Sequence, residues 1–435
     1  MFMQCKIYDR AKIILEKNKK FLTNVFSLIM LQGGQYVLTL ATLPYLARVL
    51  SPSQFGIYGF ALAISQYCII ATNYGFDISA TKDIAINKEN KEKISSLFWN
   101  VLAAKFFLAI LCFFFLILLC TFIPQLYDCA LIIVLASTQV IGSVLFPNWF
   151  FQGVEKLWGI TVSNLIARGC GLLFILCLVK SKDDLMIAII IQSLVTISSG
   201  LIGFTLVLSK KLVVKSKITF HFVFFNLKKS FSFFISNVAI SFYTLSTVIV
   251  LGIFSSSRDA GLFNGVDKIR MAVTGIVIIM NGAIYPRIIS ILENDERKAA
   301  WFIKNVAIFK LVITFFMSFL LYLFSNEVVY CILGNEYSNA VVDMKIMSPL
   351  IFLVTASVIL ANYILLPFGY NKVFVSIPIV VAVVHIAIAI PLCLMWGATG
   401  GAIAIFISEA LTNILLLYFA ITYGLVKKVM ESKND

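Results

Sequence analysis

Cationic side chains lie in unusual places in this sequence, inside long apolar stretches. Arg168 is near the middle of one such stretch, and Lys105 and Lys310 lie in two others. An ionisable group at the centre of a membrane helix costs roughly 2.5–3.5 kcal/mol on insertion scales, so it usually faces a bundle interior or a wet cavity. A guanidinium can also hold phosphate oxygens in a bidentate fork. The pattern predicts an anion-binding cavity within a membrane.

Two further arginines stand at the ends of apolar stretches and complete the predicted set of cavity cations. Arg270 begins one stretch and Arg48 ends another. Each of these cations also has a structural interpretation. Arg168 could be neutralised by carbonyls or a carboxylate, the lysine stems could reach the membrane surface, and the two terminal arginines could be interface anchors.

Four other titratable residues are candidates for coupling transport to an H⁺ or Na⁺ gradient, because such coupling needs a group that gains and loses an ion between two states. They are Asp77, Glu409, Asp267 and His385. The alternatives are structural salt bridges for the carboxylates, with Lys268 and Arg270 beside Asp267, and a neutral buried histidine. No cofactor is expected.

The elements that carry these residues are membrane spans, since 60% of the 435 residues are hydrophobic and only 13% are charged. A soluble domain usually has about 25% charged residues. The net charge of +14 comes from lysines and arginines gathered between apolar runs, which argues against nucleic-acid binding. The nine cysteines show no CxxC spacing and indicate neither a metal site nor disulfides.

Apolar runs of about twenty residues can cross the membrane as helices. We expect twelve of them, at Phe21–Ala47, Gly56–Tyr74, Leu97–Phe122, Cys129–Phe151, Ile160–Val179, Leu185–Leu208, Phe231–Phe254, Ile269–Pro286, Val306–Phe324, Met347–Phe368, Val373–Trp396 and Ala402–Tyr423. The N-terminus, the even-numbered connections and the C-terminal tail hold 25 Lys and Arg residues, against 7 in the odd-numbered connections when Arg270, at the edge of the eighth span, is counted with them. The positive-inside rule therefore places both termini in the cytoplasm.

A shift of 205 residues aligns the two halves of the chain. It brings Gly56 onto Gly261, Lys93 onto Lys298 and Lys105 onto Lys310. Two six-span repeats enter and leave on the same side, so a pseudo-two-fold axis along the membrane normal should relate them. The predicted fold is an all-α integral membrane protein of two six-helix lobes facing a shared cavity. Its parts are an amphipathic segment 1–20, lobes 21–208 and 231–423, a linker 209–230 and a tail 424–435.

Short motifs with loose spacing run through nearly the whole chain: Pro44–Leu50, Phe55–Tyr58, Asn73–Asp77 with Ala80 and Thr81, Pro147–Gly153, Ala260–Phe263 and Gly397–Ala402. In these the chain resembles the Wzx-type O-antigen and polysaccharide flippases, whose superfamily also contains multidrug exporters and the peptidoglycan-lipid flippase. The resemblance implies a bacterial inner-membrane protein that moves an undecaprenyl-pyrophosphate-linked oligosaccharide to the periplasmic leaflet by alternating access. Its partners would be membrane lipids and, where it does not act alone, a polysaccharide polymerase and a chain-length regulator.

Two other functions compete with this one. A cation-coupled multidrug exporter has the same architecture, but should have a carboxylate-rich, aromatic pocket, whereas cations dominate the mid-membrane charge here. A membrane enzyme such as an O-antigen polymerase should have a large outer loop with catalytic residues. The longest outer connection, 325–346, has no His and one Lys, and the sequence lacks a P-loop, HExxH and GxSxG. We therefore predict no catalytic residues.

Overall fold

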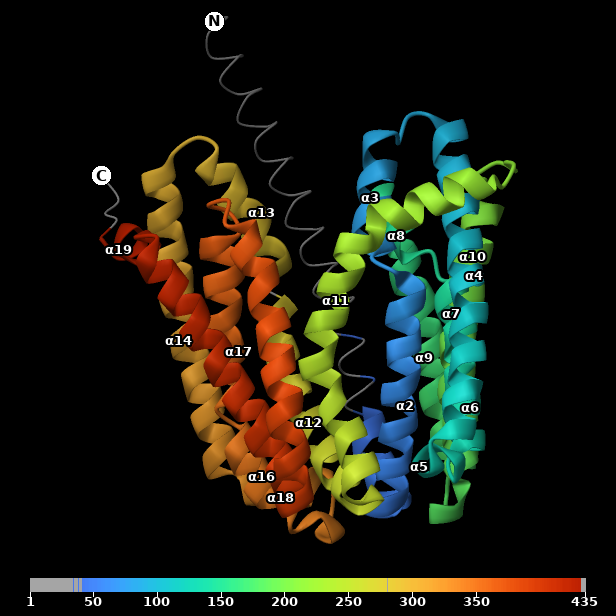
Figure 1. The fold of residues 1–435 in the computed structure, drawn as a ribbon, viewed down its shortest axis with the longest axis vertical. Helices are drawn as coiled ribbons and strands as arrows, with labels where there is room; N and C mark the ends of the chain where they lie inside the picture. The colour runs from blue at the N-terminus through green and yellow to red at the C-terminus, as the bar shows by residue number, and fades with distance from the viewer. Residues whose placement is uncertain (1–33, 35–37, 39–40, 280, 432–435) are drawn as a thin grey trace, which may run out of the picture.

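The computed structural model describes residues 34, 38, 41–279 and 281–431, and every regular element in these ranges is a helix (Figure 1). The predicted segment 1–20 and most of the first predicted span lie outside the described residues; residues 41–49 are helical. The first lobe continues with α2 (Ser51–Asn73), α3 (Phe76–Ile86), α4 (Lys91–Phe122), α5 (Pro124–Tyr127), α6 (Ala130–Ser137), α7 (Gln139–Leu145), α8 (Asn148–Gly153), α9 (Trp158–Leu178) and α10 (Leu185–Ser209).

The second lobe consists of α11 (Phe220–Phe254), α12 (Ser257–Ile279), α13 (Asn281–Leu292), α14 (Glu296–Leu323), α15 (Ser325–Ile332), α16 (Ala340–Met347), α17 (Leu350–Val358), the π-helix η3 (Ile359–Leu365), α18 (Asn371–Thr422) and α19 (Leu425–Met430). The predicted linker 209–230 is only partly irregular, since α11 begins at Phe220. Within the predicted tail, Leu425–Met430 is a short helix.

Nine segments of the described chain are long and apolar enough to cross a membrane. One of them, α18, has 52 residues and would extend about 78 Å as a straight helix, more than twice the ~30 Å hydrocarbon core. It reverses direction at Gly397, where φ is 54° and ψ is −130°. A Cβ on Gly400 would lie 2.0 Å from the Leu392 carbonyl oxygen, so the two arms pack closely after the turn. α18 therefore supplies two crossings, the eleventh and twelfth that the sequence predicts.

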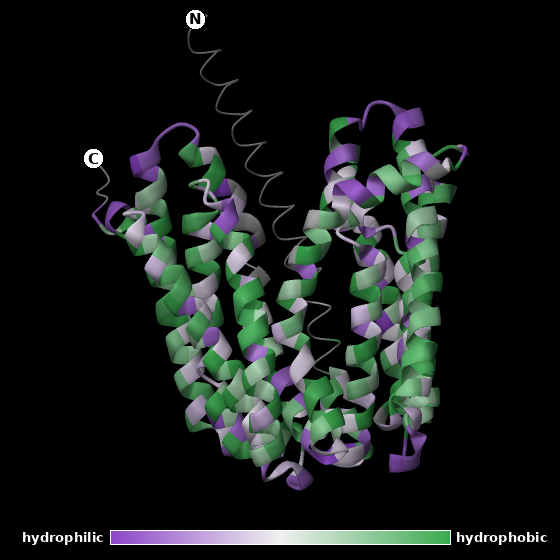
Figure 2. Ribbon diagram, in the orientation of Figure 1, coloured by the Kyte–Doolittle hydropathy of each residue, from purple (hydrophilic) through white to green (hydrophobic). Residues whose placement is uncertain are grey.

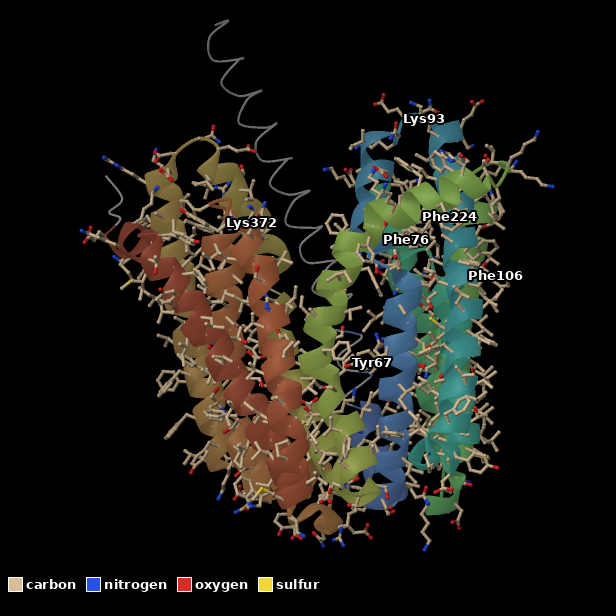
Figure 3. All side chains as sticks on the ribbon, in the orientation of Figure 1. Tyr67, Phe76, Lys93, Phe106, Phe224 and Lys372 are labelled. Atoms are coloured by element: carbon tan, nitrogen blue, oxygen red, sulfur yellow. The ribbon has the colours of Figure 1, made fainter. Side chains whose placement is uncertain are left out.

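The two lobes approach each other where α2 and α12 begin, and their ribbons diverge toward the end where α19 lies (Figure 1). α11 runs between them and contacts α2 and α3 of the first lobe and α18 of the second. On the first-lobe side, the Lys229 ammonium lies 2.6 Å from the Asp83 carboxylate. Farther along α11, the Tyr67 hydroxyl donates a 2.9 Å hydrogen bond to the Ser241 carbonyl (Figure 3). The long α11 thus belongs to the interface as well as to the second lobe.

The structure contains the 205-residue repeat in its local details. Asn90 and Asp295 are equivalent positions, and each caps the helix that follows it by accepting a backbone hydrogen bond, from Lys93 at 3.0 Å and from Lys298 at 3.1 Å. Such caps satisfy N–H groups that a helix start leaves without partners. The same type of helix start therefore occurs at the same place in both lobes.

Repeat-equivalent glycines meet each other at the end where the lobes touch. A Cβ on Gly56 would lie 1.7 Å from the Ser257 carbonyl oxygen, and a Cβ on Gly261 would lie 1.8 Å from that of Pro52. Pro52 and Ser257 are themselves 205 residues apart, so the contact is reciprocal. Reciprocity of this kind is the property of an interface on a two-fold axis. The α2–α12 contact therefore lies on the predicted pseudo-two-fold axis.

The outer surface is suited to lipid. Hydrophobic residues cover the middle of the molecule, and hydrophilic ones gather at its two ends (Figure 2). On α4, Phe106 and Phe114 are 61% and 68% exposed, and Phe106 lies at the outer edge of the first lobe (Figure 3). A large apolar surface of this kind, on helices long enough to cross a bilayer, is typical of contact with lipid. The chain is a multi-pass, all-α membrane protein, as the sequence predicts.

Candidate functional site: a polar cavity between the lobes

A cavity of about 590 Å³ lies between the first lobe and the first two helices of the second. Its walls come from the helix that ends at residue 49 and from α2, α7, α9, α10, α11 and α12. Its charged and amide-bearing lining residues are Arg168, Asp267, Lys268, Gln66, Gln139, Gln192 and Asn264. Polar groups at this depth of a membrane protein mark a substrate or ion pathway more often than a structural site. The cavity is the candidate functional site.

Arg168, which the sequence analysis names as a candidate cavity cation, lies on the cavity wall. It is ten residues into α9, which places it about 15 Å from the start of a helix about 31 Å long. α9 is held against α10 by close packing, since a Cβ on Gly171 would lie 2.2 Å from the Val195 Cγ2. The half-buried guanidinium is therefore presented near mid-membrane by a firmly packed helix.

Three charged residues of α12 form the opposite wall and its support. Asp267 lines the cavity and accepts two hydrogen bonds from Arg270, from Nε at 2.9 Å and from Nη2 at 2.6 Å. Arg270 is 6% exposed and is not among the described residues that line the cavity. Lys268 is exposed and lines the cavity. Asp267 is paired with Arg270, and the other two charged residues among the described lining, Lys268 and Arg168, are both cations. The cavity therefore suits an anion.

Glu409 extends this charged group into the second lobe. It lies on the second arm of α18, is 7% exposed, and is near enough to Arg270 for their charges to interact. Arg270 is thus bonded to Asp267 and interacts electrostatically with Glu409. Two of the four predicted coupling candidates are therefore influenced by the same arginine.

Lys105 and Lys310 lie inside their own lobes, each 2% exposed, and are not among the residues that line the cavity in this conformation. The Lys105 ammonium donates to the Ser143 carbonyl at 2.6 Å, and the Ser143 hydroxyl donates to Asn73, the last residue of α2. The Lys310 ammonium donates to Asn281, the first residue of α13. Lys310 therefore bonds directly to the start of α13, whereas Lys105 is linked to the end of α2 only through Ser143 of α7.

The other three predicted residues also lie away from the cavity lining. Arg48 donates to the carbonyl groups of Tyr330 and Cys331, which links the two lobes near the reciprocal glycine contact. Asp77 is the second residue of α3, inside the first lobe; it is half-buried and close enough to Lys105 for their charges to interact.

His385 is fully buried in the second lobe. One ring nitrogen lies 3.1 Å from the Thr247 hydroxyl and the other 2.8 Å from the Ser408 hydroxyl. Because Thr247 is on α11 and Ser408 is on the second arm of α18, the imidazole joins three membrane-crossing segments.

Lys268 and the amides of the cavity are functional candidates that the sequence analysis did not select. The sequence predicts that the eighth span begins at Ile269 and so places Lys268 in a connection, whereas α12 begins at Ser257. The glutamines carry no charge, so the pattern of intramembrane charges does not indicate them. A neutral amide inside an apolar run, as at Gln66 and Gln192, is a signal that could have found them.

The chain matches known proteins over nearly its full length. Residues 21–292 match the model of a family described as "Polysaccharide biosynthesis protein". The "Putative O-antigen transporter" of Escherichia coli K12 is 34% identical over 91% of this chain and 95% of its own length. A protein of the same description from Shigella dysenteriae is 31% identical over 91% and 98%.

Two solved structures share the fold at 13% sequence identity. One is an inward-facing multidrug resistance transporter of the MATE family, with a TM-score of 0.69 over 92% of this chain and 96% of that one. The other is the lipid II flippase MurJ in an inward closed conformation, with a TM-score of 0.67 over 94% and 90%. The chain therefore has the fold of these two transporters, and its relatives at 31% and 34% identity are described as transporters, not as enzymes. By its sequence, the chain belongs to the polysaccharide biosynthesis protein family.

Proposed function

We propose that the chain is a flippase that moves an undecaprenyl-pyrophosphate-linked repeat unit of O-antigen, or of another surface polysaccharide, across the bacterial inner membrane. The observation that carries the proposal is the position of Arg168 and Lys268 on one cavity between the lobes. A diphosphate cannot enter hydrocarbon without compensation of its charge, and these two cations supply it. The relatives named as O-antigen transporters support this class of cargo.

The orientation follows from the positive-inside count, with both termini in the cytoplasm. The end where α2 and α12 meet is then periplasmic, and the lobes are closed there. Arg48, Ser53 and Gly56 of the first lobe contact Cys331, Ser257 and Gly261 of the second. The cavity of this inward-facing state would receive the head group from the cytoplasmic leaflet, while the polyprenyl chain stays in lipid. Rocking of the lobes would then open the periplasmic end.

We assign energy coupling to Asp267, Arg270 and Glu409, with H⁺ as the coupling ion. Protonation of one carboxylate would leave Arg270 to pair with the other, which changes the charge facing the cavity between states. Asp77 and His385 remain coupling candidates from the sequence, and a Na⁺-coupled cycle would use the same carboxylates. A polymerase and a chain-length regulator are proposed partners that receive the repeat unit after translocation.

A multidrug exporter is the second candidate, because a MATE-family transporter shares the fold. A pocket for drug cations should present an uncompensated carboxylate or an aromatic face. Among the described residues that line the cavity, the carboxylate, Asp267, is bonded to Arg270, and the two aromatic residues, Phe55 and Tyr58, are buried. The lining therefore favours an anionic cargo.

Complementation of an Escherichia coli strain that lacks its own O-antigen transporter tests the proposal. We expect the wild-type chain to restore polymeric surface glycan, and Arg168→Ala and Lys268→Ala to reduce it at least tenfold at equal protein level in the membrane. Lys182→Ala, which removes an exposed cation from a connection far from the cavity, is the matched control. Normal glycan with both cavity variants would refute the anion-binding role.

A further inference from the structure

The cavity contains a second kind of polar group besides its cations. Gln66 on α2, Gln139 on α7 and Gln192 on α10 bring three amides from three helices of the first lobe to the same cavity. Asn264 adds a fourth amide from α12, in the space that the absence of a side chain at Gly59 leaves open. Amides carry no charge, so they can donate hydrogen bonds to a diphosphate but cannot neutralise it. Their convergence needs another explanation.

The most common use of an amide in a membrane bundle is to bond one helix to another. Gln139 serves this purpose: its Nε2 donates to the Ala136 carbonyl at 2.9 Å, and its Oε1 accepts from the Thr196 hydroxyl of α10 at 3.4 Å. Gln139 is also 6% exposed, which is consistent with a structural role. The structural role of Gln139 does not explain why Gln66 and Gln192 also lie at the cavity.

Gln66 and Gln192 differ from Gln139 in both respects. Within the described part of the chain, neither side-chain amide makes a hydrogen bond. Gln66 is exposed and Gln192 is half-exposed, so both amides face the cavity. A primary amide offers two N–H donors and a carbonyl acceptor with two lone pairs. Two such groups near mid-membrane keep their full bonding capacity for something that enters the cavity.

We infer that Gln66 and Gln192 form a subsite that recognises the sugars of the lipid-linked substrate, separate from the cations that hold its diphosphate. The inference rests on the proposed function. Sugar hydroxyls and acetamido groups both donate and accept hydrogen bonds, and an amide matches this dual character where a lysine or a carboxylate does not. The cavity volume of about 590 Å³ suits a head group of a few sugars rather than a polymer. The subsite would set which repeat units are carried.

The test compares two lipids on the purified full-length protein. One is undecaprenyl pyrophosphate without sugar, and the other is the lipid-linked repeat unit from an Escherichia coli strain whose surface glycan the chain restores. We expect the wild-type protein to bind the sugar-bearing lipid more tightly. Gln66→Leu with Gln192→Leu should lower that preference about tenfold, because roughly two hydrogen bonds to sugar are lost, and should leave binding of the sugarless lipid unchanged.

Three comparisons make the result decisive. Gln152→Leu removes an amide at the end of α8, outside the cavity lining, and should keep the wild-type preference. Arg168→Ala should weaken binding of both lipids equally. A double glutamine variant with the wild-type preference, or one that loses both lipids equally at an unchanged melting temperature, would overturn the sugar subsite alone. A wild-type protein that binds neither lipid would overturn the proposed function as well.

Discussion

The reciprocal glycine contact makes a quantitative prediction about the closed end of the molecule. In Gly56→Ala, the new methyl group would lie 1.7 Å from the Ser257 carbonyl oxygen and 2.8 Å from the Gly261 nitrogen, both backbone atoms that cannot rotate away. A methyl carbon needs about 3.5 Å, so α2 and α12 must separate by roughly 1.5–2 Å. Overpacking of this kind costs typically 1–3 kcal/mol. Because the open arrangement separates the two helices, it would not bear this cost.

A cost of about 2 kcal/mol lowers the population of the closed arrangement about thirtyfold relative to the open one. A cysteine pair can report that population. The hydroxyl oxygens of Ser53 and Ser257 are 2.9 Å apart across the contact, so Ser53→Cys with Ser257→Cys should form a disulfide readily. We expect oxidation to stop surface glycan export in cells, and a reductant to restore it. Adding Gly56→Ala should slow cross-linking at least tenfold.

Two controls separate this effect from others. Gly169→Ala also adds a methyl to a helical glycine, but the added atom has nothing within 4 Å, so cross-linking should keep its rate. The single cysteine variants reveal any reaction with native thiols. If Gly56→Ala cross-links as fast as the parent pair, the glycine contact does not set the closed arrangement, and the reasoning is refuted.

The remaining predictions concern the charged residues. Asp267→Asn should lower the unfolding free energy by about 3–5 kcal/mol, because it leaves Arg270 less compensated in a buried site; adding Arg270→Gln should recover part of the loss in a thermal unfolding assay, and no recovery would argue against direct pairing. An aqueous thiol reagent should label Lys268→Cys but neither Lys105→Cys nor Lys310→Cys, which are buried in this conformation; equal labelling of all three would contradict these placements. His385→Phe should cost about 1–3 kcal/mol, because two buried hydroxyls lose a partner, and an unchanged melting temperature would show that the imidazole does not join the segments.

The sequence predicts the all-α membrane fold class, the two lobes and the repeat, for physical reasons. Hydrophobic length fixes a membrane crossing, and the 205-residue offset reappears in the caps at Asn90 and Asp295 and in the meeting of Gly56 with Gly261. The offset also gives the equivalence of Lys105 and Lys310, which are both buried within their own lobes.

What the sequence cannot provide is the face of a helix on which a residue lies. In a soluble helix the polar face identifies the exposed side, but in a membrane the lipid side and the core side are both apolar. Arg168 and Lys105 therefore look alike in the sequence, although one lines the cavity and the other is buried within a lobe. The position of Lys268 within a helix is not predicted for a simpler reason. The first half of α12 is polar, so hydropathy places the start of the eighth span too late in the sequence.

The reciprocal contact at the axis has a consequence for the origin of the chain. A surface that meets its own equivalent across a two-fold axis is what a symmetric homodimer requires. A six-span ancestor with a glycine at this position could have paired with a second copy of itself before the two genes were joined. The stretch from 212 to 219, which carries no helix, would then be a late tether between subunits that already recognised each other.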